Sequence, residues 1–233
     1  MDQWISWGRG PIFLFCLAFC LLGLARLFIL FTWSTIHTWL RAGDRTVPIR
    51  RVFKKTLGYL FPPSRLSRRP LFSSVSILFH LTALPVPFFL AGHIVLWQQG
   101  LGVSWAALPT AWADGLTLLA VSTGIVLVIL RLSARMTRAI SLPSDYLIPL
   151  AVLLPFVTGY LVSHPGINPF PYQPTFLVHI LSGDFLLLLI PVSKLSHVIL
   201  FPQARLVSEI GWHWPPGAGQ RVATALGKEE TPI

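Results

Sequence analysis

The chain alternates long apolar runs with short polar segments that carry most of its charge. Five of the apolar runs are near the roughly 20 residues that an α-helix needs to cross a bilayer. They cover approximately residues 11–33, 72–97, 112–131, 145–163 and 175–200. The pattern predicts an all-α integral membrane bundle of five transmembrane helices, several of them interrupted by proline.

Composition supports a membrane protein and argues against a soluble one. Of the 233 residues, 54% are hydrophobic and 11% are charged, whereas soluble domains carry about 25% charged residues. The net charge of +10 would suit a nucleic-acid-binding protein. The basic residues, however, lie between the apolar runs, as topology signals do. We therefore predict a multi-pass membrane protein with no nucleic-acid partner.

The polar segments differ in charge from one side of the membrane to the other. The segments after the first and third runs contain these basic residues: Arg41, Arg45, Arg50, Arg51, Lys54, Lys55, Arg65, Arg68, Arg69, Arg131, Arg135 and Arg138. The segments after the second and fourth runs contain no Lys or Arg. The positive-inside rule then predicts an N-terminus outside and a C-terminus in the cytoplasm. We expect a membrane domain over residues 1–205, with a basic cytoplasmic loop at 41–70, and a cytoplasmic tail over 206–233.

Four histidines lie inside two of the predicted spans. His80 and His93 are in the second run, and His179 and His197 are in the fifth. The two runs cross the membrane in opposite directions, so one histidine from each lies at each of two depths. His80 and His197 fall toward the cytoplasm, and His93 and His179 toward the outside. Eighteen residues are five helical turns, which would place His179 and His197 on one helix face, about 27 Å apart.

The second span needs an irregularity for its histidines to pair in the same way. Thirteen residues separate His80 from His93, which places them on nearly opposite faces of a regular helix. Pro85 and Pro87 lie between them and can kink or rephase the helix. We expect such a distortion.

Histidine inside lipid is expensive and usually functional. Two pairs on two helices are what a protein needs to hold two stacked haem groups, each ligated by two imidazoles. The alternative is that the four histidines are polar contacts between helices or line a transport path. The pairing by depth favours two haem b groups and hence a transmembrane electron carrier.

A family resemblance rests on several motifs. The stretches Phe176 to His179 and Ile190 to His197 resemble the last helix of the respiratory nitrate reductase gamma subunit, including the eighteen-residue histidine spacing. Ile77 to His80 resembles the start of that subunit's second helix, and Arg131 to Asp145 resembles its basic inner loop. The resemblance covers roughly residues 72–205.

The N-terminal part resembles a neighbouring branch of the same family. Gly8 to Pro11 and the long basic loop are similar to the cytochrome b subunits of heterodisulfide-reductase-type and sulfate-reducer transmembrane complexes. The resemblance implies haem pairs His80–His197 and His93–His179. It also implies a quinone substrate (menaquinone or ubiquinone), the prokaryotic cytoplasmic membrane, and a cytoplasmic iron–sulfur partner, either heterodisulfide-reductase-like or nitrate-reductase-beta-like.

Other polar residues are weaker candidates. Lys194 and Arg131, near the inner surface, would contact haem propionates, and the alternative for Lys194 is a side chain that reaches to the interface at a helix end. Asp114 and His164, near the outer surface, are candidates for a quinone site. Their alternatives are a helix-start acid and a solvated loop histidine. Asp184 is an acid deep in a span, where it either pairs with a neighbour, sits neutral, or carries protons.

The sequence therefore predicts the haem b membrane subunit of a respiratory oxidoreductase, without a substrate-reducing site of its own. It would transfer electrons between the quinone pool and the iron–sulfur partner. One alternative keeps the haem groups and changes the partner to a molybdenum nitrate-reductase-type enzyme. The other is a haem-free membrane anchor or transporter.

Overall fold

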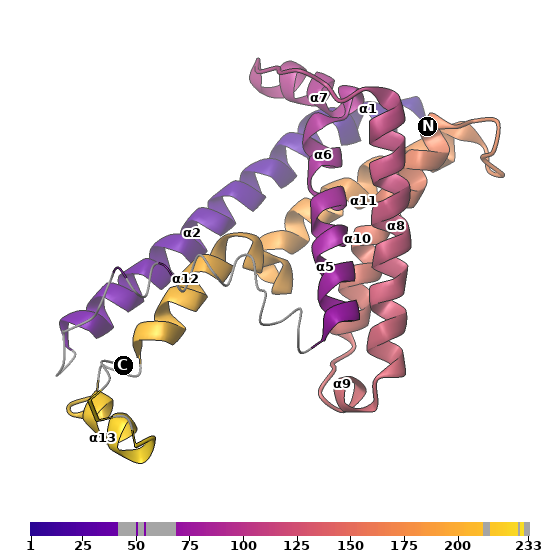
Figure 1. Ribbon diagram of the computed structural model, residues 1–233. Coiled ribbons are helices and arrows are strands. Elements are labelled where there is room, and N and C mark those ends of the chain that lie inside the picture. The colour runs from indigo at the N-terminus through magenta and orange to yellow at the C-terminus, as the bar shows by residue number, and fades with distance from the viewer. Residues whose placement is uncertain (42–49, 51–53, 55–68, 212–214, 228, 231–233) are drawn as a thin grey trace. The chain divides into compact units, whose positions relative to one another are not determined.

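The computed structural model describes the chain except for residues 42–49, 51–53, 55–68, 212–214, 228 and 231–233 (Figure 1). The chain forms two compact units. The first unit comprises Met1–Phe19 and Ser64–Leu189, and the second comprises Cys20–Pro63 and Ile190–Ile233. The described residues are helical or irregular and contain no β-strand.

Five helices are long and apolar enough to cross a membrane: Asp2–Leu40, Pro70–Phe89, Thr110–Ser133, Ser144–Ser163 and Tyr172–Val192. This confirms the all-α fold with five candidate spans. Large apolar side chains on these helices are exposed, for example Phe15 at 65% and Leu22 at 72%. Such exposure fits helices whose solvent is lipid, because a soluble protein rarely exposes continuous apolar surface of this extent.

The first unit is built around α8 (Thr110–Ser133), which packs against α5 (Pro70–Ala83) and α10 (Ser144–Ser163) (Figure 1). The buried residues of α8 are small and share one face: Ala113, Thr117, Ala120, Thr123 and Gly124. A Cβ added at Gly124 would lie 2.5 Å from Leu153 Cδ2 and 3.1 Å from Phe79 Cε2. Small residues therefore let the neighbouring helices approach closely, as is common between membrane helices.

The second span is not one regular helix over 72–97. The chain forms α5, then α6 (Pro85–Phe89), then α7 (Ala91–Leu101), and Leu90 between them is extended at φ −72° and ψ 131°. Pro85 and Pro87 lack the N–H groups that would continue the helix. The expected irregularity is confirmed, and Figure 1 shows α7 turning away from the line of α5 and α6.

The chain after α7 compensates for the break. The Leu108 N–H donates to the Phe89 carbonyl at 2.8 Å, and the Trp105 indole N–H donates to the Phe88 carbonyl at 2.9 Å. These carbonyls at the end of α6 would otherwise lack helical partners. Backbone groups left unpaired at membrane depth are costly, so the returning segment stabilises the break.

The fifth span also ends earlier than the predicted 175–200. Helix α11 (Tyr172–Val192) contains Pro191 and stops before Ser193, which is extended. The Ser193 Oγ accepts from the Leu195 N–H at 3.2 Å and so caps η2 (Lys194–Ser196). Helix α12 (His197–Ile210) follows. The prediction that one regular helix places His179 and His197 on the same face is therefore wrong.

The first helical segment is longer than predicted. It consists of α1 (Asp2–Trp7), the π-helix η1 (Gly8–Ile12) and α2 (Phe13–Leu40). The tail contains a short helix, α13 (Ala218–Ala225), which the sequence did not indicate.

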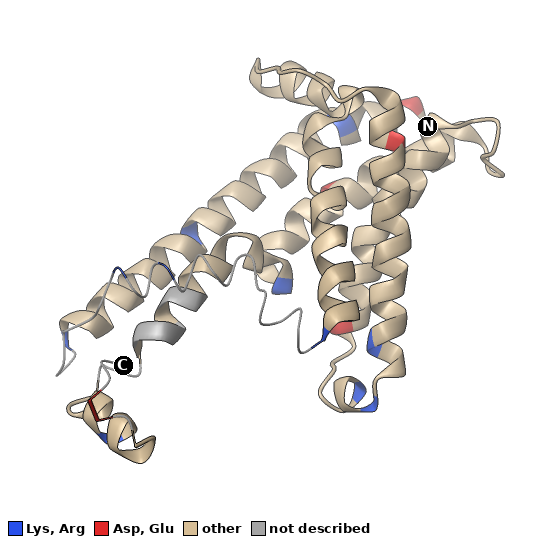
Figure 2. Ribbon diagram, viewed as in Figure 1, with Lys and Arg blue, Asp and Glu red and all other residues tan. Residues whose placement is uncertain are grey.

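Charge in the first unit gathers at the helix ends. In Figure 2 the middle parts of α5, α8 and α10 are tan and therefore uncharged, and blue basic residues lie around α9 (Arg135–Ala139). This matches the basic segment expected after the third run. Most of the predicted basic loop 41–70 lies outside the described residues.

Candidate functional site

His93 and His179 lie close together within the first unit. Their ring centres are 5.9 Å apart, and their planes are nearly parallel, with an angle of 11°. His93 is near the start of α7 and His179 is in α11. The structure thus brings together the two histidines that were expected at the outer depth.

Backbone carbonyls hold both rings through the same nitrogen. The Nδ1 of His93 lies 3.1 Å from the Pro87 carbonyl oxygen, and the Nδ1 of His179 lies 2.9 Å from the Pro155 carbonyl oxygen. A carbonyl oxygen only accepts, so each Nδ1 carries the proton and donates it. In a neutral imidazole this leaves the lone pair on Nε2, which is the arrangement of a metal-binding histidine with a fixed tautomer.

Local sequence explains how the His179 ring reaches a carbonyl in another helix. Pro155 and Gly159 are four residues apart on α10 and therefore share a face. A Cβ added at Gly159 would lie 2.8 Å from His179 Cε1 and 3.0 Å from its Nδ1. The missing side chain of Gly159 allows the ring to lie against the α10 backbone.

The centre-to-centre distance of this stacked pair is close to that of two axial imidazoles on one iron. An imidazole nitrogen lies about 2.0 Å from its metal and about 1.1 Å from its own ring centre, so two imidazoles on one iron have centres about 6.2 Å apart. The observed 5.9 Å is close to this value. No group of three or more His, Cys, Asp or Glu that could hold a metal occurs among the described residues. A porphyrin iron requires only two protein ligands of this kind.

Two glycines lie near these histidines in the sequence. A Cβ added at Gly92 or Gly183 would meet no atom within 4 Å. Gly92 precedes His93, and Gly183 is one turn after His179. The backbone is therefore open beside both candidate ligands.

His80 and His197 have the same tautomer but different surroundings. The Nδ1 of His80 lies 2.7 Å from the Ser76 carbonyl oxygen, and the Nδ1 of His197 lies 2.8 Å from the Lys194 carbonyl oxygen. His80 belongs to the first unit and His197 to the second. Their pairing, and the propionate contact of Lys194, stay predictions.

Arg131 has a partner that the sequence analysis did not identify. Its guanidinium lies 3.2 Å from the Asp145 carboxylate and donates to Ser141 Oγ at 3.4 Å. These contacts join the end of α8 to the start of α10. The contact of Arg131 with a haem propionate stays a prediction.

Asp114 and His164, predicted separately as quinone-site residues, lie together. The His164 Nε2 is 3.4 Å from Asp114 Oδ2. Asp114 is in the second turn of α8, and His164 directly follows α10. The antiparallel packing of the two helices brings these ends side by side.

Asp184 is buried deep in α11, with a relative exposure of 5%. Its Oδ2 has no hydrogen-bond partner among the described atoms and lies 3.9 Å from the position of a Cβ at Gly8. The sequence correctly marked it as an intramembrane acid, and the structure adds that this oxygen faces the π-helix η1.

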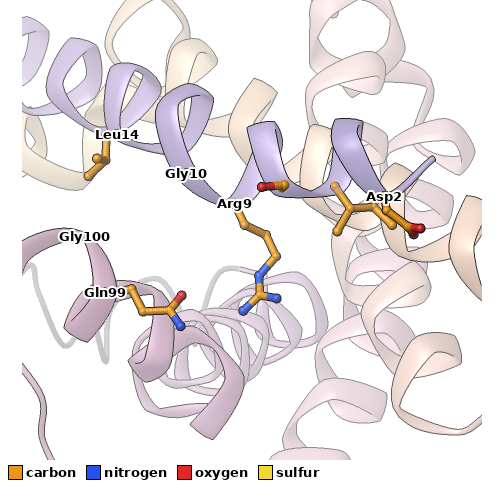
Figure 3. Close-up of a pocket in the computed structure, with 8 residues that line it drawn as sticks. Asp2, Arg9, Gly10, Leu14, Gln99 and Gly100 are labelled. Carbon is orange, nitrogen blue, oxygen red and sulfur yellow. The ribbon is translucent and has the colours of Figure 1, made fainter.

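A cavity of about 430 Å³, which is not predicted from the sequence, lies between the N-terminal helices and α7. Figure 3 shows the Arg9 and Gln99 side chains extending into the space between these segments. Gly100 makes the approach close, because a Cβ there would lie 2.9 Å from Leu14 Cδ2.

Comparison with known proteins identifies a relative. A protein of Nitratidesulfovibrio vulgaris (strain Hildenborough), whose name states no function, is 35% identical over 162 residues. These residues are 68% of this chain and 70% of that protein. No protein-family model matches the chain, and no solved structure matches it. Because the similarity extends over most of both sequences, the chain belongs to the same family as this N. vulgaris protein.

Proposed function

We propose that the chain is the dihaem b membrane subunit of a respiratory oxidoreductase. It transfers electrons between the quinone pool and a cytoplasmic iron–sulfur protein. The observation that carries the proposal is the His93–His179 pair, with ring centres 5.9 Å apart and each Nδ1 bonded to a carbonyl. The five candidate membrane spans agree with this role.

His93 and His179 would hold the outer haem through their Nε2 atoms. A haem b bound there carries single electrons through its iron, which changes between the ferric and ferrous states. The carbonyls of Pro87 and Pro155 fix both ring planes and make the imidazoles stronger donors. Gly159 keeps the His179 ring in place by leaving room for it.

His80 and His197 would hold the inner haem. The His80 ring is held by the Ser76 carbonyl of its own helix, and the His197 ring by the Lys194 carbonyl of the preceding η2. The Lys194 ammonium is the candidate for contact with haem propionates, since cations near a helix end balance carboxylates at the membrane surface.

In the proposed orientation, with the N-terminus outside and the C-terminus inside, the basic segments lie in the cytoplasm, where an iron–sulfur partner would bind. Reporter fusions test this orientation. A reporter that is active only outside the cytoplasm should be active at residue 166 and inactive at residue 136. The two loops differ in their content of basic residues, because α9 carries Arg135 and Arg138 and the outer loop carries no Lys or Arg. The reverse pattern of activity would overturn the orientation.

The identity of the cytoplasmic partner distinguishes two versions of the proposal. The resemblance of the N-terminal part favours a heterodisulfide-reductase-like iron–sulfur protein. The resemblance of residues 72–205 also allows a molybdenum nitrate-reductase-type enzyme. Purification of the native complex distinguishes them. Iron and acid-labile sulfide without molybdenum support the first, and molybdenum in the complex supports the second.

A haem-free transporter is the second candidate, and one observation favours it. The Asp184 carboxyl is buried in a span with an unpartnered oxygen, as is common for acids on proton or ion pathways.

A reduced-minus-oxidised absorption spectrum of the purified full chain decides between the two. The proposal predicts a b-type band with a haem-to-chain ratio near two. A chain purified from haem-replete cells without any b-type band would overturn it and leave the transporter.

A further inference from the structure

The Asp114–His164 contact is built from the ends of two antiparallel helices. The His164 imidazole is held on three sides. Its Nε2 lies 3.4 Å from Asp114 Oδ2, its Nδ1 lies 2.9 Å from the Tyr160 carbonyl oxygen, and the Tyr160 ring stacks on it with centres 4.2 Å apart. The histidine is therefore fixed in position and orientation.

Proton counting shows what this pair can do. The Tyr160 carbonyl only accepts, so the His164 Nδ1 carries a proton. Without a second proton, the Nε2 lone pair would face a carboxylate oxygen, and the contact would be repulsive. The contact is attractive with one proton between the two groups, on Nε2 or on Oδ2. Asp114 and His164 thus form a base that takes up one proton as a unit.

The pair lies near the candidate outer haem ligands. Gly159 on α10 contacts the His179 ring, and His164 is five residues further along the chain. This separation is about 7.5 Å of rise along a helix. The side chains of His164 and Asp114 are 32% and 27% exposed. A proton taken up there can therefore leave to the surroundings.

We propose that Asp114 and His164 act as one acid–base pair that accepts the protons of a hydroquinone oxidised beside His93 and His179. This inference rests on the proposed function. A hydroquinone loses two electrons and two protons to become a quinone. For each O–H bond that breaks, a ferric haem held by His93 and His179 would take up the electron and the pair would take up the proton. The pair must release the proton it already holds to the outside before it accepts each new one.

The test uses the full chain in lipid nanodiscs, with menadiol and a short-chain ubiquinol as probes. The variants Asp114→Asn and His164→Gln should each slow haem reduction by at least about 10-fold, since a positioned base contributes roughly 10²–10⁴-fold. The double variant should be no slower than the slower single variant, because the two groups act together. Asp2→Asn is the matched control. Its carboxylate accepts from the Gln173 amide at 3.0 Å in the same unit, and its rate should be that of the unsubstituted chain.

A second readout does not depend on electron transfer. In ¹⁵N NMR of the imidazoles, with His164→Gln used for assignment, Asp114→Asn should shift the His164 Nε2 signal, because this nitrogen loses its carboxylate partner. An unchanged signal would overturn the pairing.

The outcomes separate the inference from the proposed function. A chain without a b-type band removes the proposed function itself. A normal b-type spectrum with wild-type reduction rates in both single variants overturns the acid–base pair and leaves the haem assignment standing. If the rate losses of the two single variants multiply in the double variant, Asp114 and His164 do not act as a unit.

Discussion

The two proposed histidine pairs differ in what holds their rings. The rings of His93 and His179, the proposed outer pair, depend on tertiary structure, because the Nδ1 of His179 bonds to a carbonyl 24 residues away and that of His93 bonds across the break at Leu90. The rings of His80 and His197 bond to carbonyls only four and three residues away in the sequence. Packing thus orients the outer pair, whereas local helix geometry orients the other two rings.

This difference predicts that the ring orientations respond differently to changes in helix packing. A change in helix packing should move the outer rings and leave the orientation of the other two unchanged. The carbonyl partners of the His93 and His179 rings come from α6 and α10, whereas the histidines belong to α7 and α11.

The largest effect is expected from removal of an outer ligand. His93→Ala or His179→Ala should lower the haem-to-chain ratio from about two to about one, because a haem with one axial imidazole is lost during purification. A pyridine haemochrome assay against protein concentration measures it. A ratio that stays at two in both variants would show that these residues are not ligands.

An intermediate effect is expected at Gly159. In Gly159→Ala the new methyl group would lie 2.8 Å from His179 Cε1, so the ring must shift and its bond to the Pro155 carbonyl must weaken. Loss of such an outer-shell partner typically costs about 10–100-fold in metal affinity. We expect partial loss of one haem, or a change in the low-spin electron paramagnetic resonance signal of one haem only.

Gly115→Ala is the matched control for Gly159→Ala. Gly115 also lies in a membrane helix, and a Cβ there would meet no atom within 4 Å. Its haem content and spectrum should equal those of the unsubstituted chain. Equal spectra for both glycine variants would remove the packing explanation of the His179 orientation.

The smallest effect is expected at the C-terminal end of α8, where Arg131 pairs with Asp145. Arg131→Gln or Asp145→Asn should each lower the free energy of unfolding by about 1 kcal/mol, since the pair is partly exposed. Thermal unfolding in detergent measures it, and haem content should be unchanged. Haem loss in Arg131→Gln but not in Asp145→Asn would instead assign Arg131 to a propionate.

The sequence predicted the regular helices well and the broken ones poorly. The expected runs 112–131 and 145–163 correspond to α8 and α10, because these spans are bounded by polar loops and satisfy their backbone internally. The sequence predicts a distortion in the run 72–97 near Pro85 and Pro87, but a continuous helix over 175–200, since hydropathy does not register a single extended residue. Leu90 and Ser193 are the points at which those helices end.

The candidate residues were identified more readily than their partners. Histidine in an apolar run is visible in a sequence, and so is an isolated acid such as Asp114. The contacts of Asp114 with His164 and of Arg131 with Asp145 were not predicted, since each joins two helices whose relative register depends on packing. The role of Gly159 was likewise hidden, because only the bound ring shows why a side chain is excluded there.

Double variants test the central claim most directly, because they reveal which histidines share an iron. If His93 pairs with His179, the double variant His93→Ala/His179→Ala keeps about one haem per chain. The crossed variant His80→Ala/His93→Ala should keep none. Equal haem content in the two double variants would contradict the account.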